Sequence, residues 1–420
     1  MNSFLVAFRR YVLPTIMIIL IVYTMFYIPI SRSMTFLSNT SLKSSEQTKI
    51  EGESMNFQST PNIKLTLEKL QALIDAEAKR MDRSSTPVPM TYQLTEAPTV
   101  ATSLRTPENN YIRGQLVEEP KRGDEHIIFL ETSCILGEKN TTMNRNKTGL
   151  VLKPRSACAI ESAARTNPNR KVYVVYSCPI VGAIENSSEH VMQLFEYPNV
   201  KIWKLNVTEY FANTPLEKWE FYKKMNTSKW PLSHSSDVLR YLTLWKYGGT
   251  YLDMDFIIVR SLDDLGSNFV GAQSHNYIAS GALNFRTEGV GQVVAHLCIR
   301  DLEKNFKGTV WGMNGPDVIT RVLKSLCGKS EINQMTKEEC LGFVVYPPEV
   351  FYKIPYWRHK AFFDANSSNI TMKELDGSFG VHVWNKFTTS LNITVGSKQP
   401  YGLLAEKFCP RVYSNCGKVF

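Results

Sequence analysis

The chain has 420 residues, of which 43% are hydrophobic and 11% aromatic, which is ample for one large domain or two fused halves with appendages. Its 48 Lys and Arg outnumber its 39 Asp and Glu, giving a formal net charge of +9. The basic residues are scattered and form no stripe, so the charge does not favour nucleic acid as a partner, whereas an anionic membrane surface or a phosphate-bearing ligand is compatible with it.

The N-terminus predicts a membrane anchor. Residues 1–10 form a short tail with Arg9, Arg10 and no acid, and residues 11–30 follow without a charge. A helix of that length spans roughly 30 Å, about one hydrocarbon core. The alternative is a cleaved secretory signal, but the apolar run is longer than a signal core and no small-x-small site follows it. We therefore expect a single-pass type II protein with a cytosolic tail and a lumenal body.

Two further features agree with a lumenal body. The eight cysteines include no CxxC pair that would suggest zinc, and an even number in an oxidising compartment is typical of a disulfide set. The short anchor suits the thin membranes of the early secretory pathway, so we expect the Golgi apparatus membrane. N-glycosylation sequons are frequent in the body, at Asn140, Asn146, Asn186, Asn206, Asn226, Asn366, Asn369 and Asn392.

Residues 31–120 predict a lumenal stem. They are rich in Ser, Thr and Pro and have too little apolar content to build a core. One amphipathic piece, residues 65–77, has helical spacing. It is either a stem helix that pairs with itself, which would produce a homo-oligomer, or a helix that lies on the body.

The body, from residue 126 onward, alternates strands with a helix. The runs HIIFLETS, VYVVYS and VKIWKL predict strands, and SACAIESAART, between the first two, predicts a helix. This alternation predicts an α/β domain with a mainly parallel central sheet. Ligands bind beyond the carboxyl ends of such strands, so we expect Thr132, at the end of the first strand, near a nucleotide pocket.

The most informative stretch is SDVLRYLTLWKYGGTYLDMDFIIVR, residues 236–260. Its apolar residues recur at helical spacing up to a Gly-Gly pair, a usual helix stop. This places Asp237 in the first turn of a helix and Arg240 one turn later on the same edge. After the glycines the residues alternate as in a strand, so Asp253 and Asp255 are expected on one face with their carboxylates roughly 7 Å apart.

This pattern suits transfer from a nucleotide sugar. The donor leaves as a diphosphate, and a divalent cation can neutralise its developing negative charge as a Lewis acid. All-oxygen ligation selects Mg²⁺ or Mn²⁺. An Asp-x-Asp alone arises by chance, and the other parts have ordinary explanations as an ion pair and a helix stop. Their joint occurrence at this spacing favours a glycosyltransferase.

Further stretches extend the pattern into a family resemblance. With IIFLETS, ESAARTNP, GALNF, WGMNGPDVITRVL, PPEVFYKIPYW and VHVWNK, residues 126–420 resemble the retaining glycosyltransferases with an Asp-x-Asp sugar-binding region, in particular their α1,4-galactosyltransferase and α1,4-N-acetylglucosaminyltransferase branch. The resemblance implies a GT-A fold, a UDP-sugar donor, Mn²⁺ (or Mg²⁺) and retention of the α configuration. It also implies a nucleotide-sugar-binding half, residues 121–270, and an acceptor-binding half, residues 271–420.

The same resemblance implies roles for the residues of the long motif. Asp237 and Arg240 match positions that hold the donor hexose. Asp253 matches a position that binds ribose and sugar, and Asp255 matches the metal ligand. We treat these four side chains as the catalytic set.

Residues from the second half complete the site that the resemblance implies. His382 is expected to complete the metal or diphosphate site and Trp384 to close over the donor, although a buried strand is an equally simple interpretation of this stretch. Asn314 stands where some relatives carry Gln, which bears on acceptor identity. The residues expected at the acceptor are Trp311, Asn314, Gly315 and Asp317.

One disulfide pairing is also expected. Cys327 and Cys340 flank a short polar segment that would otherwise be floppy, and relatives carry both. Closing so short a loop would stabilise the fold by about 3 kcal/mol in the chain-entropy model.

We therefore expect a Golgi enzyme that moves galactose from UDP-galactose to a glycosphingolipid in α1,4 linkage, with UDP-GalNAc or UDP-GlcNAc as the alternative donor. A protein-linked glycan is the alternative acceptor. No carboxylate stands out as a covalent nucleophile, which favours front-face transfer. The rival of another class is a catalytically silent lumenal binding protein, and the intact Asp and Arg set argues against it.

The topology yields a first testable prediction. In sealed microsomal vesicles the body should resist added protease and carry endoglycosidase-sensitive mass, because the uncharged span behind Arg9 and Arg10 orients it into the lumen. Immunoblotting with and without detergent measures this. Digestion of the body in intact vesicles would refute the topology.

Overall fold

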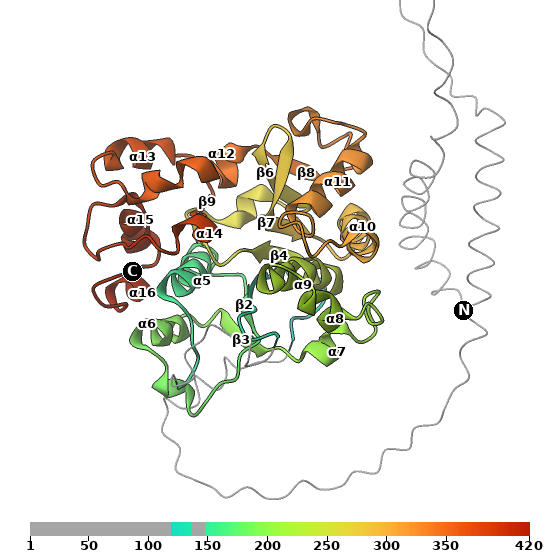
Figure 1. Ribbon diagram of the computed structural model, residues 1–420. Helices are drawn as coiled ribbons and strands as arrows, with labels where there is room; N and C mark the ends of the chain where they lie inside the picture. Colours follow the sequence, from blue (N-terminus) through green and yellow to red (C-terminus); the bar gives the residue numbers. More distant parts are fainter. Residues whose placement is uncertain (1–118, 137–147) are drawn as a thin grey trace, which may run out of the picture. The chain divides into compact units, whose positions relative to one another are not determined.

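The computed structural model describes residues 119–136 and 148–420 (Figure 1). The predicted tail and anchor, and all but the last two residues of the predicted stem, lie outside these ranges. Within them, no helix combines the length and apolar character needed to cross a membrane.

The described strands form two sheets. The larger has seven strands in the order β3-β2-β1-β4-β7-β6-β8, and the smaller pairs β5 with β9. In the larger sheet the pairs β1–β2, β2–β3, β1–β4 and β6–β8 are parallel, while β4–β7 and β6–β7 are antiparallel, so the predicted α/β domain with a mainly parallel sheet is confirmed. The strands are β1 Ile127–Glu131, β2 Val172–Tyr176, β3 Val200–Lys204, β4 Gly249–Leu252, β5 Phe256–Ile258, β6 Phe269–Ser274, β7 Tyr277–Phe285, β8 Val344–Tyr346 and β9 Gly380–His382.

Helices cover the sheet and extend the domain toward the C-terminus (Figure 1). Helix α9 contacts β1, β4 and β7 and also packs on α10, which in turn contacts α11. The helices are α5 Pro154–Thr166, α6 Glu189–Met192, α7 Val207–Phe211, α8 Phe221–Asn226, α9 Pro231–Tyr247, α10 Gly289–Asn305, α11 Pro316–Cys327, α12 Pro348–Phe351, α13 Ser368–Glu374, α14 Asn385–Thr388, α15 Pro400–Phe408 and α16 Pro410–Ser414, with a 3-10 helix, η7, at Tyr356–Phe363.

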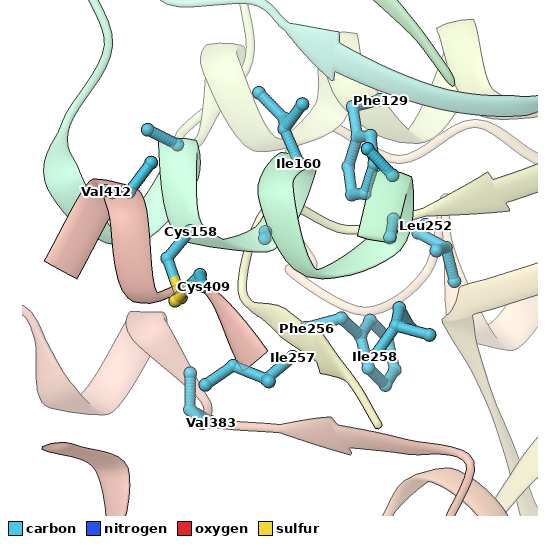
Figure 2. Packing of buried hydrophobic residues seen from close by; sticks show 14 of the residues in the cluster. Phe129, Cys158, Ile160, Leu252, Phe256, Ile257, Ile258, Val383, Cys409 and Val412 are labelled. Carbon is cyan, nitrogen blue, oxygen red and sulfur yellow. A yellow bond between two sulfur atoms is a disulfide. The ribbon is translucent and has the colours of Figure 1, made fainter. Parts of the chain in front are cut away.

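Helix α5, near the start of the described residues, packs against the last helices of the chain. It follows β1 as predicted, and its small buried residues allow close contact with β2 and β5 on one side and with α15 and α16 on another. A disulfide links Cys158 on α5 to Cys409, which are 251 residues apart in sequence (Figure 2). In the chain-entropy model, closing a loop of this length stabilises the folded state relative to the unfolded chain by about 5.5 kcal/mol.

Two other disulfides complete those of the described residues. Cys134 pairs with Cys178, and Cys327 pairs with Cys340, which confirms the expected short loop. The expectation of a complete disulfide set is wrong for two cysteines. Cys298 is buried within α10 and Cys416 is half-buried, and neither is bonded to another cysteine.

Helix α9 carries the first part of the long motif. It begins at Pro231, whose fixed φ suits a first helical turn, and not near Asp237. Asp237 therefore lies in the second turn, which corrects the predicted first-turn position. The predicted stop is confirmed, because Gly248 and Gly249 have φ of 71° and 82°. A Cβ on Gly249 would lie 2.6 Å from Cδ2 of His126, so glycine is also needed for this close approach.

The Asp-x-Asp segment is a turn and not part of a continuous strand. Strand β4 ends at Leu252 and β5 begins at Phe256 in the other sheet, with the N–H of Phe256 donating to the carbonyl of Asp253 at 3.2 Å. The expected alternation of side chains through this segment is therefore wrong. The chain changes sheet here, and the turn aims both carboxylates at a segment that β9 supplies.

His126 yields a prediction for acid stability. It is buried before β1 and its Nε2 lies 3.2 Å from the carbonyl of Gly248. Burial lowers its pKa from 6.5 to about 4. Between pH 6.5 and 4 the unfolded state binds the proton and the folded state does not. The contribution of His126 to the free energy of unfolding therefore decreases as the pH is lowered through this range, by about 3 kcal/mol in total.

Chemical unfolding of the wild type and His126→Gln at pH 7 and pH 4.5 tests this. Gln can keep a donor toward Gly248 but does not titrate, so the variant should lose less free energy of unfolding on acidification. The difference between the two proteins removes the effect of other titrating groups. Equal losses would show that His126 is not the source.

Candidate active site

A cavity of about 940 Å³ lies where β1 and β4 end. Thr132 follows β1 and Asp253 follows β4, so the predicted position at the carboxyl ends of the strands holds. Asn314 and Gly315 do not line the cavity. The predicted residues that do are Thr132, Asp237, Arg240, Asp253, Asp255, Trp311, Asp317, His382 and Trp384.

Two carboxylates and an imidazole converge on one side of this cavity. Antiparallel pairing sets His382 of β9 opposite Phe256 of β5, directly after the Asp-x-Asp turn. Its Nε2 lies 3.0 Å from Oδ1 of Asp255 and 3.8 Å from Oδ2 of Asp253. One ligand atom from each residue lies within 4.8 Å of the others, so the turn brings the carboxylates closer than the expected 7 Å.

These three residues fit a divalent cation. The side chains present two carboxylate oxygens and one nitrogen on the same wall of a cavity that a small ion can enter. Mg²⁺ strongly prefers oxygen, whereas Mn²⁺ accepts carboxylate and is closer to the metals that imidazole suits. The donor set therefore fits Mn²⁺ better than Mg²⁺, with Asp255 and His382 as predicted ligands and Asp253 beside them.

The electrostatics of the group also favour a cation. Burial lowers the pKa of His382, but the carboxylates of Asp255 and Asp253 outweigh burial and raise it to about 9. Burial raises the pKa of Asp253, and Arg240 together with hydrogen bonds from His382 and Tyr251 lowers it to about 2. The two carboxylates therefore hold a proton on His382, and a divalent ion bound by these side chains would replace that proton.

Arg240 holds the acidic side chains in place. Its Nη2 lies 3.1 Å from Oδ1 of Asp237 and its Nη1 lies 3.0 Å from Oδ1 of Asp253. It also donates to the carbonyl of Ser280 at 2.7 Å and to the carbonyl and hydroxyl of Ser236. These acceptors match the five N–H groups of a guanidinium. Arg240 is therefore a positioning residue, and its predicted position on the same edge as Asp237 is confirmed.

Gly315 makes room for Asp237. A Cβ at Gly315 would lie 2.3 Å from Oδ1 of Asp237, and the carbonyl of Gly315 accepts a hydrogen bond from the hydroxyl of Tyr241 at 2.6 Å. Burial raises the pKa of Asp237, Arg240 opposes this, and the result is about 7. Gly315 thus allows helix α11 to start against this buried carboxyl, next to the cavity.

Asn314 closes the loop that carries Trp311. Its buried amide accepts from the N–H of Lys307 and donates to the carbonyl of Lys307, both at 2.9 Å. Trp311 projects at the cavity, and Asp317 accepts a hydrogen bond from the hydroxyl of Tyr277 at 2.5 Å. Of the four residues predicted at the acceptor, Trp311 and Asp317 line the cavity and Asn314 and Gly315 support it.

Trp384 is part of the buried wall behind His382. The two ring centroids lie 4.3 Å apart, and the indole Nε1 donates to the carbonyl of Ile354 at 2.8 Å. Its φ of 57° is unusual for a bulky side chain, and sterically costly conformations of this kind cluster at functional sites. The stretch is both a buried strand and a cavity wall, so the two interpretations of the sequence coexist.

Sequence reasoning missed two tyrosines. The hydroxyl of Tyr251 donates to Oδ1 of Asp253 at 2.6 Å, and the ring of Tyr251 lies 4.8 Å from the Arg240 guanidinium. Tyr352 lines the cavity with a buried hydroxyl that has no hydrogen-bond partner in the described structure. Tyr251 follows the glycines within the motif, and Tyr352 lies in the stretch PPEVFYKIPYW, so the family resemblance could have pointed to both.

Comparisons with known proteins agree with this site. Residues 153–271 match the family described as glycosyltransferase sugar-binding region containing DXD motif, and residues 287–416 match the alpha 1,4-glycosyltransferase conserved region. The lactosylceramide 4-alpha-galactosyltransferase of Rattus norvegicus is 34% identical over 289 residues, which cover 69% of this chain and 75% of that protein. The chain belongs to the α1,4-glycosyltransferase family. Human alpha-1,4-N-acetylglucosaminyltransferase is 27% identical over 295 residues, covering 68% and 79% of the two chains.

Solved structures resemble this α1,4-glycosyltransferase only distantly. The galactosyltransferase LgtC in complex with donor and acceptor sugar analogs is 14% identical with a TM-score of 0.33, covering 69% of this chain and 96% of that chain. The assignment therefore rests on the sequence matches. As a family member the chain is a UDP-sugar-dependent hexosyltransferase, and members of the DXD family typically bind a divalent metal together with the UDP-sugar.

Asp255 and Asp253 should respond differently to the loss of a charge. Asp255→Asn should lower Mn²⁺ affinity and sugar transfer by about 10²–10³-fold, because a charged ligand is lost while the acceptor for the N–H of Asn385 remains. Asp253→Asn should differ by destabilising the fold as well, by about 2–4 kcal/mol, because buried Arg240 loses an ionised partner. Calorimetric Mn²⁺ titration and thermal unfolding measure the two effects.

Asp317→Asn is the matched control. It makes the same isosteric change in the same cavity, but its carboxylate bonds Tyr277 and not His382. Its Mn²⁺ affinity should equal that of the wild type. Wild-type turnover by a folded Asp255→Asn protein would contradict the role assigned to Asp255.

Proposed function

We propose that this protein transfers galactose from UDP-galactose to a glycolipid in α1,4 linkage with retention of configuration, with lactosylceramide as the model acceptor. The observation that carries the proposal is the group Asp253, Asp255 and His382 on the wall of a large cavity. It occurs in a chain 34% identical, over 289 residues, to a lactosylceramide 4-alpha-galactosyltransferase.

The donor half of the cavity has the parts that this reaction needs. Asp255 and His382, with Asp253 beside them, would hold Mn²⁺, which when bound neutralises negative charge on the departing UDP. Arg240 and the hydroxyl of Tyr251 both contact Oδ1 of Asp253 and keep it ionised and fixed in direction. A fixed carboxylate of this kind can accept hydrogen bonds from the hydroxyls of ribose or sugar.

Retention requires the acceptor oxygen to bond the anomeric carbon on the face that UDP leaves. In this step the acceptor O–H breaks, the new C–O bond forms, the sugar–phosphate C–O bond breaks, and the proton passes to a β-phosphate oxygen. Among the described residues, the carboxylates lining the cavity are Asp237, Asp253, Asp255 and Asp317.

Each of these carboxylates already has a partner. Asp237 and Asp253 pair with Arg240, Asp255 bonds Asn385 and His382, and Asp317 bonds Tyr277. We infer front-face transfer, in which none of these four carboxylates bonds the anomeric carbon.

We further propose that the enzyme works as a type II protein of the Golgi membrane with its catalytic domain in the lumen. The support is the uncharged span behind Arg9 and Arg10, the three disulfides among the described residues, and the sequons of the body. Within the same site, UDP-GalNAc or UDP-GlcNAc is the alternative donor, and a protein-linked glycan is the alternative acceptor.

A donor panel tests the proposal. The purified full-length protein, lactosylceramide and Mn²⁺ are incubated with UDP-galactose, UDP-GalNAc or UDP-GlcNAc, and the products are identified by mass spectrometry and glycosidase digestion. We expect UDP-galactose to be used at least about tenfold faster than the others, since a donor that lacks a matched polar contact loses at least about 1.4 kcal/mol. An α-galactosidase should remove the added sugar.

Metal dependence is checked in the same assay. Chelation should stop transfer and Mn²⁺ should restore it better than Mg²⁺, because His382 contributes a nitrogen ligand. Preferred use of UDP-GalNAc or UDP-GlcNAc, or a product that resists α-galactosidase, would replace the proposed donor or linkage. Full activity in the chelator would contradict the metal site.

A further inference from the structure

Exposed aromatic side chains form a patch at the rim of the active-site cavity. Trp357 is 64% exposed, Phe387 42% and Tyr356 41%. The ring of Tyr356 lies 5.1 Å from that of Trp357 and is stacked on that of Phe387 at 5.6 Å. Tyr356 and Phe387 line the cavity, whereas Trp357 does not. This rim patch, Tyr356, Trp357, His359 and Phe387, therefore leads from the cavity outward.

The rim patch is held by well-defined structure. It comes from η7 and α14, which contact one another. Arg358 donates to both carboxylate oxygens of Glu374 on α13, at 2.6 and 2.9 Å, which secures η7 from behind. The ring of His359 also stacks on Phe387 at 5.8 Å. Trp357 thus projects from a braced helix, and its exposure is a feature of the folded domain.

The two segments that carry the rim patch contain basic residues and no acid. Residues 352–363 contain Lys353, Arg358 and Lys360 but no Asp or Glu, and residues 377–400 contain Lys386 and Lys398 and again no acid. Arg358 and Lys353 have carboxylate partners, but Lys360 forms no ion pair with any residue that the structure describes. Lys386 lines the cavity, and its Nζ lies 5.7 Å from the ring centroid of Trp311. Exposed Trp and Tyr together with free Lys is the composition that suits the headgroup layer of a bilayer.

We propose that the rim patch docks on the membrane surface that displays the acceptor, with Trp357 entering the headgroup layer and Lys360 facing lipid phosphates. The proposal rests on the proposed glycolipid acceptor, whose sugars must reach the cavity while its hydrocarbon tail stays in the bilayer. Tyr356 and Phe387 lie between the cavity, which would hold the sugars, and the bilayer surface, which would hold the lipid. Trp357 lies outside the cavity lining, so a bound acceptor sugar does not account for its exposure.

Two acceptors with the same disaccharide separate docking from chemistry. The full-length protein in phosphatidylcholine proteoliposomes is assayed with sub-saturating lactosylceramide in the bilayer and, separately, with free lactose. Trp357→Ser should slow transfer to lactosylceramide by about tenfold, the effect of losing roughly one buried aromatic side chain, and leave transfer to lactose within about twofold. Trp357→Phe should retain most of the bilayer activity.

Tyr222→Ser is the matched control. Tyr222 on α8 is another exposed aromatic residue, at 46%, but it does not line the cavity and lies outside the rim patch. It should change neither activity. Equal losses with both acceptors for Trp357→Ser, or no loss with either, would overturn docking.

A second measurement does not depend on the acceptor. In proteoliposomes of brominated phosphatidylcholine without any sugar substrate, the fluorescence difference between wild type and Trp357→Ser should be strongly quenched relative to ordinary lipid. An unquenched Trp357 would overturn docking even if lactosylceramide is a substrate. If neither lactosylceramide nor lactose is used, the proposed function fails and the quenching still decides whether the rim patch meets the bilayer.

Discussion

The active site depends on one buried guanidinium. Arg240 leaves helix α9 and reaches the end of β4 and the backbone of β7, so a single side chain fixes three elements relative to one another. Burying an arginine is costly unless its donors are paired, and here each finds an acceptor. Asp253 supplies a compensating charge, and the contacts with Arg240 hold both Asp237 and Asp253 in single orientations. The orientation of Asp253 in the group Asp253, Asp255 and His382 therefore depends on Arg240.

The sequence predicted the elements whose patterns are local. The apolar runs of β1, β2 and β3, the helix between the first two, and the glycine stop of α9 all follow from burial and backbone preference, and all are present. The helix start was placed too late because Pro231 lies before the motif and extends α9 by more than a turn. Such errors of boundary arise because caps depend on neighbours in space as well as on local residues.

The Asp-x-Asp turn shows why the rest could not be read from the sequence. Its residues alternate like a strand, but β5 pairs with β9, which lies more than a hundred residues later and takes the chain out of the first sheet. Periodicity reports only local geometry, so it could not reveal this change of partner. The resemblance likewise placed Asn314 and Gly315 at the acceptor, but it could not show that their close contacts are with the backbone of Lys307 and with Asp237.

The long-range disulfide has a consequence for how the protein is made. The disulfide partner of Cys158 is synthesised 251 residues later, and His382 also lies in this C-terminal part of the chain. At ribosomal speeds of roughly 5–20 residues per second, the first cysteine is synthesised about 10–50 s before its partner. Throughout that interval its thiol is available to wrong partners, notably the nearby Cys134 and Cys178. Correct pairing therefore requires that Cys158 stay reduced, or be released from a wrong partner by thiol exchange, until Cys409 has been made, and a chain that stops short of Cys409 lacks the crosslink that secures α5.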